Sequence, residues 1–270
     1  MVAYGILAAH YPTRGVGEGG SGVASMVIVR DGNVIMPARF NLAREKDLMG
    51  KLITLTAADG FRLSAYRADP AGDPRGAVVV TQEIFGVNSH IKSVCDGFAR
   101  DGYAAIAPAL FDRYERNVDI GYTAEDIARG RALKAKAATD AALQDIAAAR
   151  DALGGAGKVG IVGYCWGGFI TWMSACRLNG FACAVAYYGG GMLEAIAETP
   201  KCPVMAHFGE RDSVLPIDGV KRFAAAHPEV EVFIYAADHG FNCDQRGSYD
   251  AAAAALARER TLQHFRRWLG

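Results

Sequence analysis

A single thiol occupies the kind of sharp turn that exposes a nucleophilic side chain. Cys165 lies in the segment Val162-Gly163-Tyr164-Cys165-Trp166-Gly167, which has the spacing Gly-x-Cys-x-Gly. A buried strand over 158–162 is predicted before this segment and an apolar helix after it, and the glycines permit a tight corner. A lone cysteine between glycines is more often a core residue. The strand and the helix on either side favour Cys165 as a nucleophile.

A thiol nucleophile needs a base, and four histidines follow Cys165 in the sequence. His239 stands in a loop after the predicted strand 230–235, so we predict that it is the base. His227 closes a predicted helix and His264 lies within the last one, and both are expected at the surface. His207 lies inside a predicted strand and is expected to be a buried structural imidazole.

The base in turn needs a group that orients it, and Asp212 is the best candidate. It ends the segment Gly209-Glu210-Arg211-Asp212 after the predicted strand 204–208, and apolar residues behind it would seat the loop. Other acids are less suitable because they begin a helix or lie too close to the histidine in sequence: Asp218, Asp238 and Asp244. The chain order thiol, acid, histidine is that of a nucleophile-elbow hydrolase.

Strand and helix signals alternate along most of the chain, as they must to bring these residues to one edge of a sheet. Strands are predicted at 51–56, 61–66, 77–80, 104–107, 159–162, 182–187, 204–208 and 230–235. The first two form a hairpin, with Gly60 where the turn needs a positive φ. Helices are predicted at 90–100, at 123–153 with a break near Thr139, and at 248–269. The predicted fold class is α/β, with a mostly parallel sheet covered by helices on both faces.

The chain divides near Met49. Residues 1–48 show little periodicity, and Gly17 to Gly22 matches G-x-G-x-x-G without a strand before it or a helix after it, which favours a flexible segment. Residues 1–48 are interpreted as a disordered extension or as the product of a mis-assigned start, because Met49 directly precedes the first strand. Residues 49–270 are interpreted as one domain.

Composition argues against several classes of partner. The chain has 29 basic and 29 acidic residues, so no electrostatic footprint for nucleic acid or an anionic membrane is visible. No apolar run approaches the roughly 20 residues that span a bilayer, and no signal peptide is recognisable. The six cysteines form no C-x-x-C pair, which favours reduced thiols over disulfides or a zinc site. We expect a cytoplasmic enzyme without metal or cofactor, as a monomer or small homo-oligomer.

Five segments together resemble the dienelactone hydrolases, or carboxymethylenebutenolidases. They are Gln82 to Asn88, Gly163 to Gly168, Tyr187 to Gly189, the Asp212 loop and His239 to Phe241. The resemblance covers residues 50 to 268 in order. It implies an α/β-hydrolase with a Cys, Asp, His triad that acts on a small-molecule lactone or activated ester.

The resemblance also implies roles for residues around the thiol. Glu83 would lie beside Cys165 and take part in activating the thiol when substrate binds. The backbone amides of Ile84 and Trp166 would form the oxyanion hole, which agrees with the general geometry of such sites.

Substrate contacts are where this chain departs from the family pattern. Arg113 matches the first of two arginines that hold a substrate carboxylate, but Cys243 occupies the position of the second. Arg246, three residues later, is the nearest substitute, and Tyr188 completes the predicted substrate-binding residues. A displaced arginine forfeits part of a forked, charge-assisted contact, so specificity for the dienelactone itself does not follow.

Alternatives remain open at this stage. The same site could serve a carboxylesterase of broader specificity. A redox-active thiol protein would also expose one cysteine at a helix start, and a catalytically silent protein could share the fold. The hydrolase is favoured because all four polar residues of its site are present: Glu83, Cys165, Asp212 and His239.

Overall fold

The computed structural model describes residues 28–30, 33–35 and 50–270. The chain forms two compact units, Met1–Lys46 and Asp47–Gly270. In the first, β1 (Ile28–Arg30) and β2 (Asn33–Ile35) pair as an antiparallel ribbon, which the sequence analysis did not predict. The rest of the interpretation of residues 1–48, including the glycine motif from Gly17 to Gly22, lies outside the described residues.

The second unit is built on an eight-stranded sheet whose order is β10-β9-β8-β7-β5-β6-β4-β3. Its strands are β3 (Lys51–Thr56), β4 (Arg62–Ala68), β5 (Ala77–Thr81), β6 (Ala104–Pro108), β7 (Val159–Tyr164), β8 (Cys183–Tyr187), β9 (Val204–Gly209) and β10 (Glu231–Tyr235). Six neighbouring strands run parallel: β6, β5, β7, β8, β9 and β10. At the other edge, β3 and β4 form the predicted hairpin, and β4 pairs antiparallel with β6.

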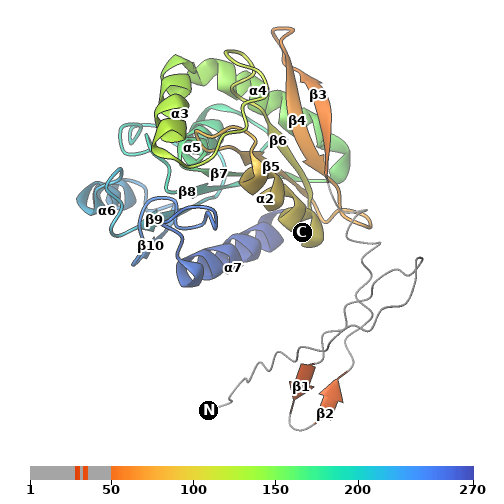
Figure 1. Cartoon of the computed structure of the whole chain (residues 1–270), viewed down its shortest axis with the longest axis vertical. Helices are drawn as coiled ribbons and strands as arrows, with labels where there is room; N and C mark the ends of the chain where they lie inside the picture. Colours follow the sequence, from red (N-terminus) through yellow and green to blue (C-terminus); the bar gives the residue numbers. More distant parts are fainter. Residues whose placement is uncertain (1–27, 31–32, 36–49) are drawn as a thin grey trace, which may run out of the picture. The chain divides into compact units, whose positions relative to one another are not determined.

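Helices cover both faces of this sheet, as predicted (Figure 1). They are α2 (Ser89–Arg100), α3 (Ala124–Lys136), α4 (Thr139–Ala152), α5 (Trp166–Arg177), α6 (Ile217–Ala226) and α7 (Ala251–Trp268). Phe98 of α2 packs on Phe265 of α7, with ring centroids 5.6 Å apart, so these two helices share one face. The other face carries α4 and α5, which contact each other.

Burial explains why the central strands could be recognised. All residues of β5, β6, β7 and β8 are buried, which is the environment that nearly continuous apolar runs require. Between β6 and β7, a capping box of Thr123 and Asp126 begins α3, and the helical stretch breaks before Thr139 as predicted. The last helix begins later than the predicted residue 248, because the Asp250 side chain accepts the Ala253 N–H as its N-cap.

Two histidines were predicted wrongly as surface residues. His227 is buried against the rings of Trp172 and Phe223, and His264 is buried beside Trp268. His227 ends α6 but packs on α5, and the Ala-rich α7 turns His264 inward, so position along the chain did not reveal either burial. The prediction for His207 is confirmed, since it is fully buried.

Polar neighbours satisfy the buried His207 ring. Its Nδ1 is 2.8 Å from the Tyr235 hydroxyl and its Nε2 is 3.2 Å from the Thr261 Oγ1. Burial lowers the pKa of His207 to about 3, so the imidazole is neutral and structural. Within the described residues, no helix combines the length and the apolar character that a bilayer crossing would need.

Candidate active site

Cys165 stands at a strained corner between β7 and α5. Its φ is 54° and its ψ is −118°, a conformation that side-chain-bearing residues rarely adopt. The corner depends on close backbone approach, because a Cβ on Gly163 would lie 2.1 Å from the Gly167 carbonyl oxygen. A Cβ on Gly167 would lie 2.3 Å from the Thr81 oxygen of β5. The corner leaves Cys165 only partly buried although the residues beside it are buried.

The predicted base and acid form a hydrogen-bonded pair. His239 Nδ1 is 2.7 Å from Asp212 Oδ2, so Nδ1–H donates to the carboxylate and Nε2 is left for the thiol. The other carboxylate oxygen, Oδ1, accepts the backbone N–H of Val214 at 2.8 Å and that of Leu215 at 3.1 Å. The loop after β9 therefore fixes the carboxylate, and the carboxylate fixes the imidazole.

The protonation of His239 responds to the thiol. Burial by itself lowers the pKa of this imidazole, but the negative charge of Cys165 and the hydrogen bond with Asp212 outweigh it. Together they raise the pKa of His239 to about 10. The hydrogen bond with Cys165 and its charge are among the causes of this shift, which places the thiol next to the His239 imidazole.

Tyr188 contacts the same imidazole. Its ring meets the His239 ring edge to face with centroids 5.1 Å apart, and its φ of 37° shows that the chain turns sharply after β8. The buried hydroxyl has no hydrogen-bond partner among the described residues. Burial raises the pKa of the Tyr188 phenol well above its usual value, so the group is a neutral donor beside the histidine.

Glu83 and Arg246 form an ion pair at the site. Glu83 is 1% exposed, and its Oε1 accepts a hydrogen bond from Arg246 Nη1 at 3.2 Å. Burial lowers the pKa of Arg246, but the nearby Glu83 charge and the Cys165 thiol raise it overall, which places this cation near Cys165. The guanidinium also lies over the ring of Phe85, 5.7 Å from its centroid.

The two backbone amides expected to form an oxyanion hole are free to donate. Among the described residues, neither the Ile84 N–H nor the Trp166 N–H has a hydrogen-bond partner. Trp166 begins α5, where helix geometry leaves the first N–H groups without partners. Its ring stacks on Phe111 with centroids 5.0 Å apart and an interplanar angle of 6°, which holds the start of the helix in place.

Arg113 is engaged elsewhere. Its guanidinium donates to both carboxylate oxygens of Asp145 and to both of Asp59, and it lies over the Phe61 ring. Burial raises the pKa of Asp145. The pKa of Asp59 is lowered, chiefly by its hydrogen bond with Arg113. A substrate anion at Arg113 would have to compete with these two carboxylates.

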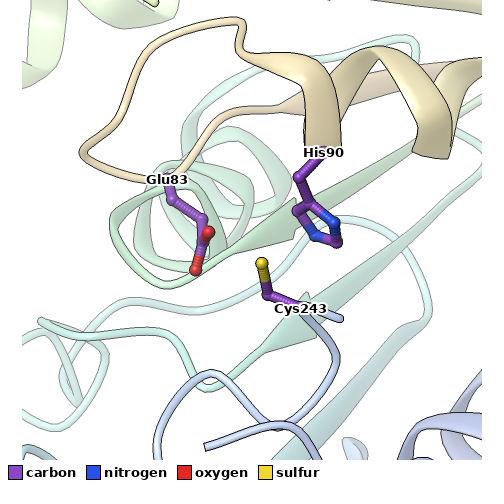
Figure 2. Close-up of side chains that lie close together, drawn as sticks. All are labelled: Glu83, His90 and Cys243. Carbon is purple, nitrogen blue, oxygen red and sulfur yellow. The ribbon is translucent and has the colours of Figure 1, made fainter. Parts of the chain in front are cut away.

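Two neighbours of Glu83 were not predicted as part of any site. His90, in the first turn of α2, and Cys243, in the loop after β10, both point their side chains toward Glu83 (Figure 2). One departure in the sequence points to this place, because Cys243 stands where the family pattern has an arginine.

Comparison with known proteins accounts for most of the chain. The family model described as "Dienelactone hydrolase family" matches residues 63–269. A Synechocystis protein named "Putative carboxymethylenebutenolidase" is 35% identical over 240 residues, covering 81% of this chain and 97% of its own. A carboxymethylenebutenolidase of Pseudomonas putida is 33% identical over 223 residues, covering 78% and 93%.

The fold is matched by solved structures. The crystal structure titled "Putative Dienelactone Hydrolase" from Klebsiella pneumoniae has a TM-score of 0.70 and 29% identity, covering 81% of this chain and 98% of that one. Together with the sheet order and the helices on both faces, it confirms the predicted α/β-hydrolase fold.

Proposed function

The chain belongs to the dienelactone hydrolase family and is a hydrolase, and from that premise we propose that it cleaves lactones or activated carboxylic esters with Cys165 as nucleophile. The observation that carries this proposal is the pairing of His239 with Asp212 beside a thiol at a strained strand-to-helix corner. A redox thiol would need no such pair.

Attack begins when the thiol loses its proton to His239, whose Nε2 faces away from Asp212. The thiolate adds to the carbonyl carbon, and the oxygen that gains charge accepts hydrogen bonds from the Ile84 and Trp166 amides. Collapse breaks the carbon–oxygen bond, and His239 returns its proton to the leaving alkoxide. In a lactone, the alcohol stays attached to the acyl group. Water, deprotonated by His239, then adds to the thioester carbonyl; the carbon–sulfur bond breaks, the carboxylic acid product leaves, and His239 returns the proton to the Cys165 thiolate.

Glu83 supplies a second route for the thiol proton. In the resting structure its carboxylate is held by Arg246. A substrate carboxylate would compete for the guanidinium, which would leave the buried Glu83 carboxylate without its partner and free to accept the thiol proton. This arrangement supports a role for Arg246 in coupling anion binding to activation of Cys165.

Replacing the nucleophile tests the central proposal. Cys165→Ala is expected to lower kcat/KM for a lactone or an activated ester by at least about 10³-fold, with an unchanged melting curve. Cys202→Ala removes another partly buried thiol and should keep full activity. If Cys165→Ala retains more than half the activity with a native melting curve, Cys165 is not the nucleophile.

A carboxylesterase of broader specificity is the second candidate, and the ion pairs favour it. Arg113 and Arg246 both face protein carboxylates, so neither stands free for a substrate anion. If Arg246 binds such an anion, Arg246→Ala should lower turnover of carboxylate-bearing lactones at least about 10-fold more than that of neutral esters. Arg113→Ala should instead lower stability and affect both substrates equally. If each variant loses turnover equally on both kinds of substrate, the broader esterase is favoured. If Arg113→Ala loses turnover only on carboxylate-bearing lactones, Arg113 binds the substrate carboxylate as the sequence predicts.

A further inference from the structure

Three potential metal ligands converge at Glu83, one of the residues of the proposed mechanism. Glu83 follows β5, His90 lies in the first turn of α2, and Cys243 lies in the loop after β10. One ligating atom from each lies within 4.8 Å of the others, and all three residues are buried. Figure 2 shows the three side chains pointing toward one another from these separate segments.

Two polar atoms in this cluster lack hydrogen-bond partners. Within residues 50–270, neither Glu83 Oε2 nor His90 Nε2 has one, although both are buried. Buried polar atoms are nearly always paired, and each exception calls for a partner that the protein alone does not supply. His90 Nδ1 lies 3.6 Å from Asp244 Oδ1, which leaves Nε2 as the nitrogen available to a ligand.

The donor set matches one class of ion. A thiolate, an imidazole and a carboxylate are the three ligand types that bind Zn²⁺, whereas Mg²⁺ and Ca²⁺ prefer oxygen alone. Ligands around a tetrahedral zinc stand roughly 3.5 Å apart, so the 4.8 Å spread needs only small side-chain rotations. We propose that Glu83, His90 and Cys243 form a Zn²⁺ site, with Asp244 orienting the His90 ring as an outer carboxylate.

No closely spaced cysteines mark this site in the sequence. Here the ligands come from three segments that only the folded sheet brings together. The site leaves a fourth position for water, and Zn²⁺ on Glu83 Oε2 occupies lone pairs that would otherwise accept the thiol proton, while Oε1 stays with Arg246. A bound ion therefore inhibits hydrolysis reversibly, a consequence that rests on the proposed role of Glu83 in thiol activation.

Zn²⁺ could instead bind at Cys165 and His239. Cys165 and His239 also offer a thiolate and an imidazole, so loss of activity on adding zinc would not identify the site. A direct binding signal from the Cys243 sulfur is required. Co²⁺ supplies it, because thiolate-to-cobalt charge transfer gives a near-ultraviolet band when sulfur is a ligand.

The experiment uses the full chain and its single variants. Cys165→Ser should bind one Co²⁺ with the charge-transfer band intact, and Zn²⁺ should displace the Co²⁺. Cys243→Ser should lose the band and bind Zn²⁺ more than about 100-fold more weakly. His90→Gln should weaken binding similarly, and Asp244→Asn by about 10- to 100-fold. Cys202→Ser is the matched control and should bind as the wild type does.

Melting curves show which variants are folded, and His90→Gln keeps the test valid if Cys243→Ser fails to fold. The proposal is overturned if folded Cys243→Ser or His90→Gln binds Zn²⁺ as tightly as the wild type, or if Cys165→Ser abolishes the band. If the binding results are as expected but the zinc-loaded wild type hydrolyses at its metal-free rate, the metal site stands and the role of Glu83 fails.

Discussion

Asp212 controls what the neighbouring imidazole can do. Its carboxylate accepts the His239 Nδ1–H and two backbone N–H groups, so it is fixed in place. The carboxylate charge is one of the causes that raise the pKa of His239 to about 10. Stabilisation from the charged imidazole is thus complete below its ordinary pKa near 6.5 and is lost as the pH rises through 10.

Asp212→Asn tests this control through the pH dependence of the reaction. We expect kcat/KM to fall by roughly 10³- to 10⁴-fold, because the amide no longer fixes the tautomer. The alkaline limb of the profile should move to lower pH, since the pKa of His239 falls when the charge is removed. Asp218→Asn, at an exposed position in the first turn of α6, should leave both unchanged. An unshifted alkaline limb would show that Asp212 does not tune the base.

Among the elements, the elbow depends on contact between β5 and α5. Gly167, in the first turn of α5, packs on the backbone oxygens of Thr81 and Gln82, and this contact sets where Trp166 presents its N–H. Backbone atoms cannot move aside as a flexible side chain can. The strand end, the thiol and the amide therefore keep their positions together.

Gly167→Ala should separate these elements. The added Cβ would lie 2.3 Å from the Thr81 oxygen and 2.4 Å from the Gln82 oxygen. Overpacking of this kind costs about 1–3 kcal/mol, which lowers the melting temperature by roughly 2–12 °C in a domain of this size, and turnover should fall further because the oxyanion donor shifts. Gly154→Ala, where a Cβ would meet nothing within 4 Å, is the control for calorimetry and kinetics. Equal melting temperatures for the two variants would contradict this account.

The elements differ in how far the sequence predicts them. The central strands and the corner at Cys165 were predicted because apolar runs and glycine spacing are local signals. The partners of Arg113 were not, because Asp59 and Asp145 lie 54 and 32 positions away and only the packed hairpin and α4 bring them close. The error at His264 has a similar cause, since an alanine-rich helix gives little sign of which face is buried.

At the scale of the whole molecule, the residues of the candidate site all lie at one edge of the sheet, where its parallel strands end. Glu83, Cys165, Tyr188, Asp212 and His239 follow β5, β7, β8, β9 and β10 respectively, and parallel strands place their carboxyl ends together. The buried hydrophobic residues of the second unit extend from Leu55 to Leu269. This unit thus contains its own core as well as every residue of the proposed mechanism.

A chain of residues 49–270 should therefore fold and work alone. We expect its melting temperature and its turnover of an activated ester to equal those of the full chain, because the described core and site lie within these residues. Both proteins would be compared by calorimetry and steady-state kinetics. Insolubility or a markedly lower melting temperature of the shorter chain would show that residues 1–48 contribute to the stability of the domain.

The ion pair between Glu83 and Arg246 joins residues 163 positions apart, and this separation matters while the protein is being made. Synthesis proceeds from the N-terminus, so the Cys165 thiol leaves the ribosome well before the segment that carries His239 and Arg246. During that interval the thiol lacks the proposed base, and the Glu83 carboxylate lacks its arginine partner. Under the proposed mechanism, the nascent chain consequently carries an ordinary cysteine, and the thiol becomes reactive only once translation has passed the last strand of the sheet.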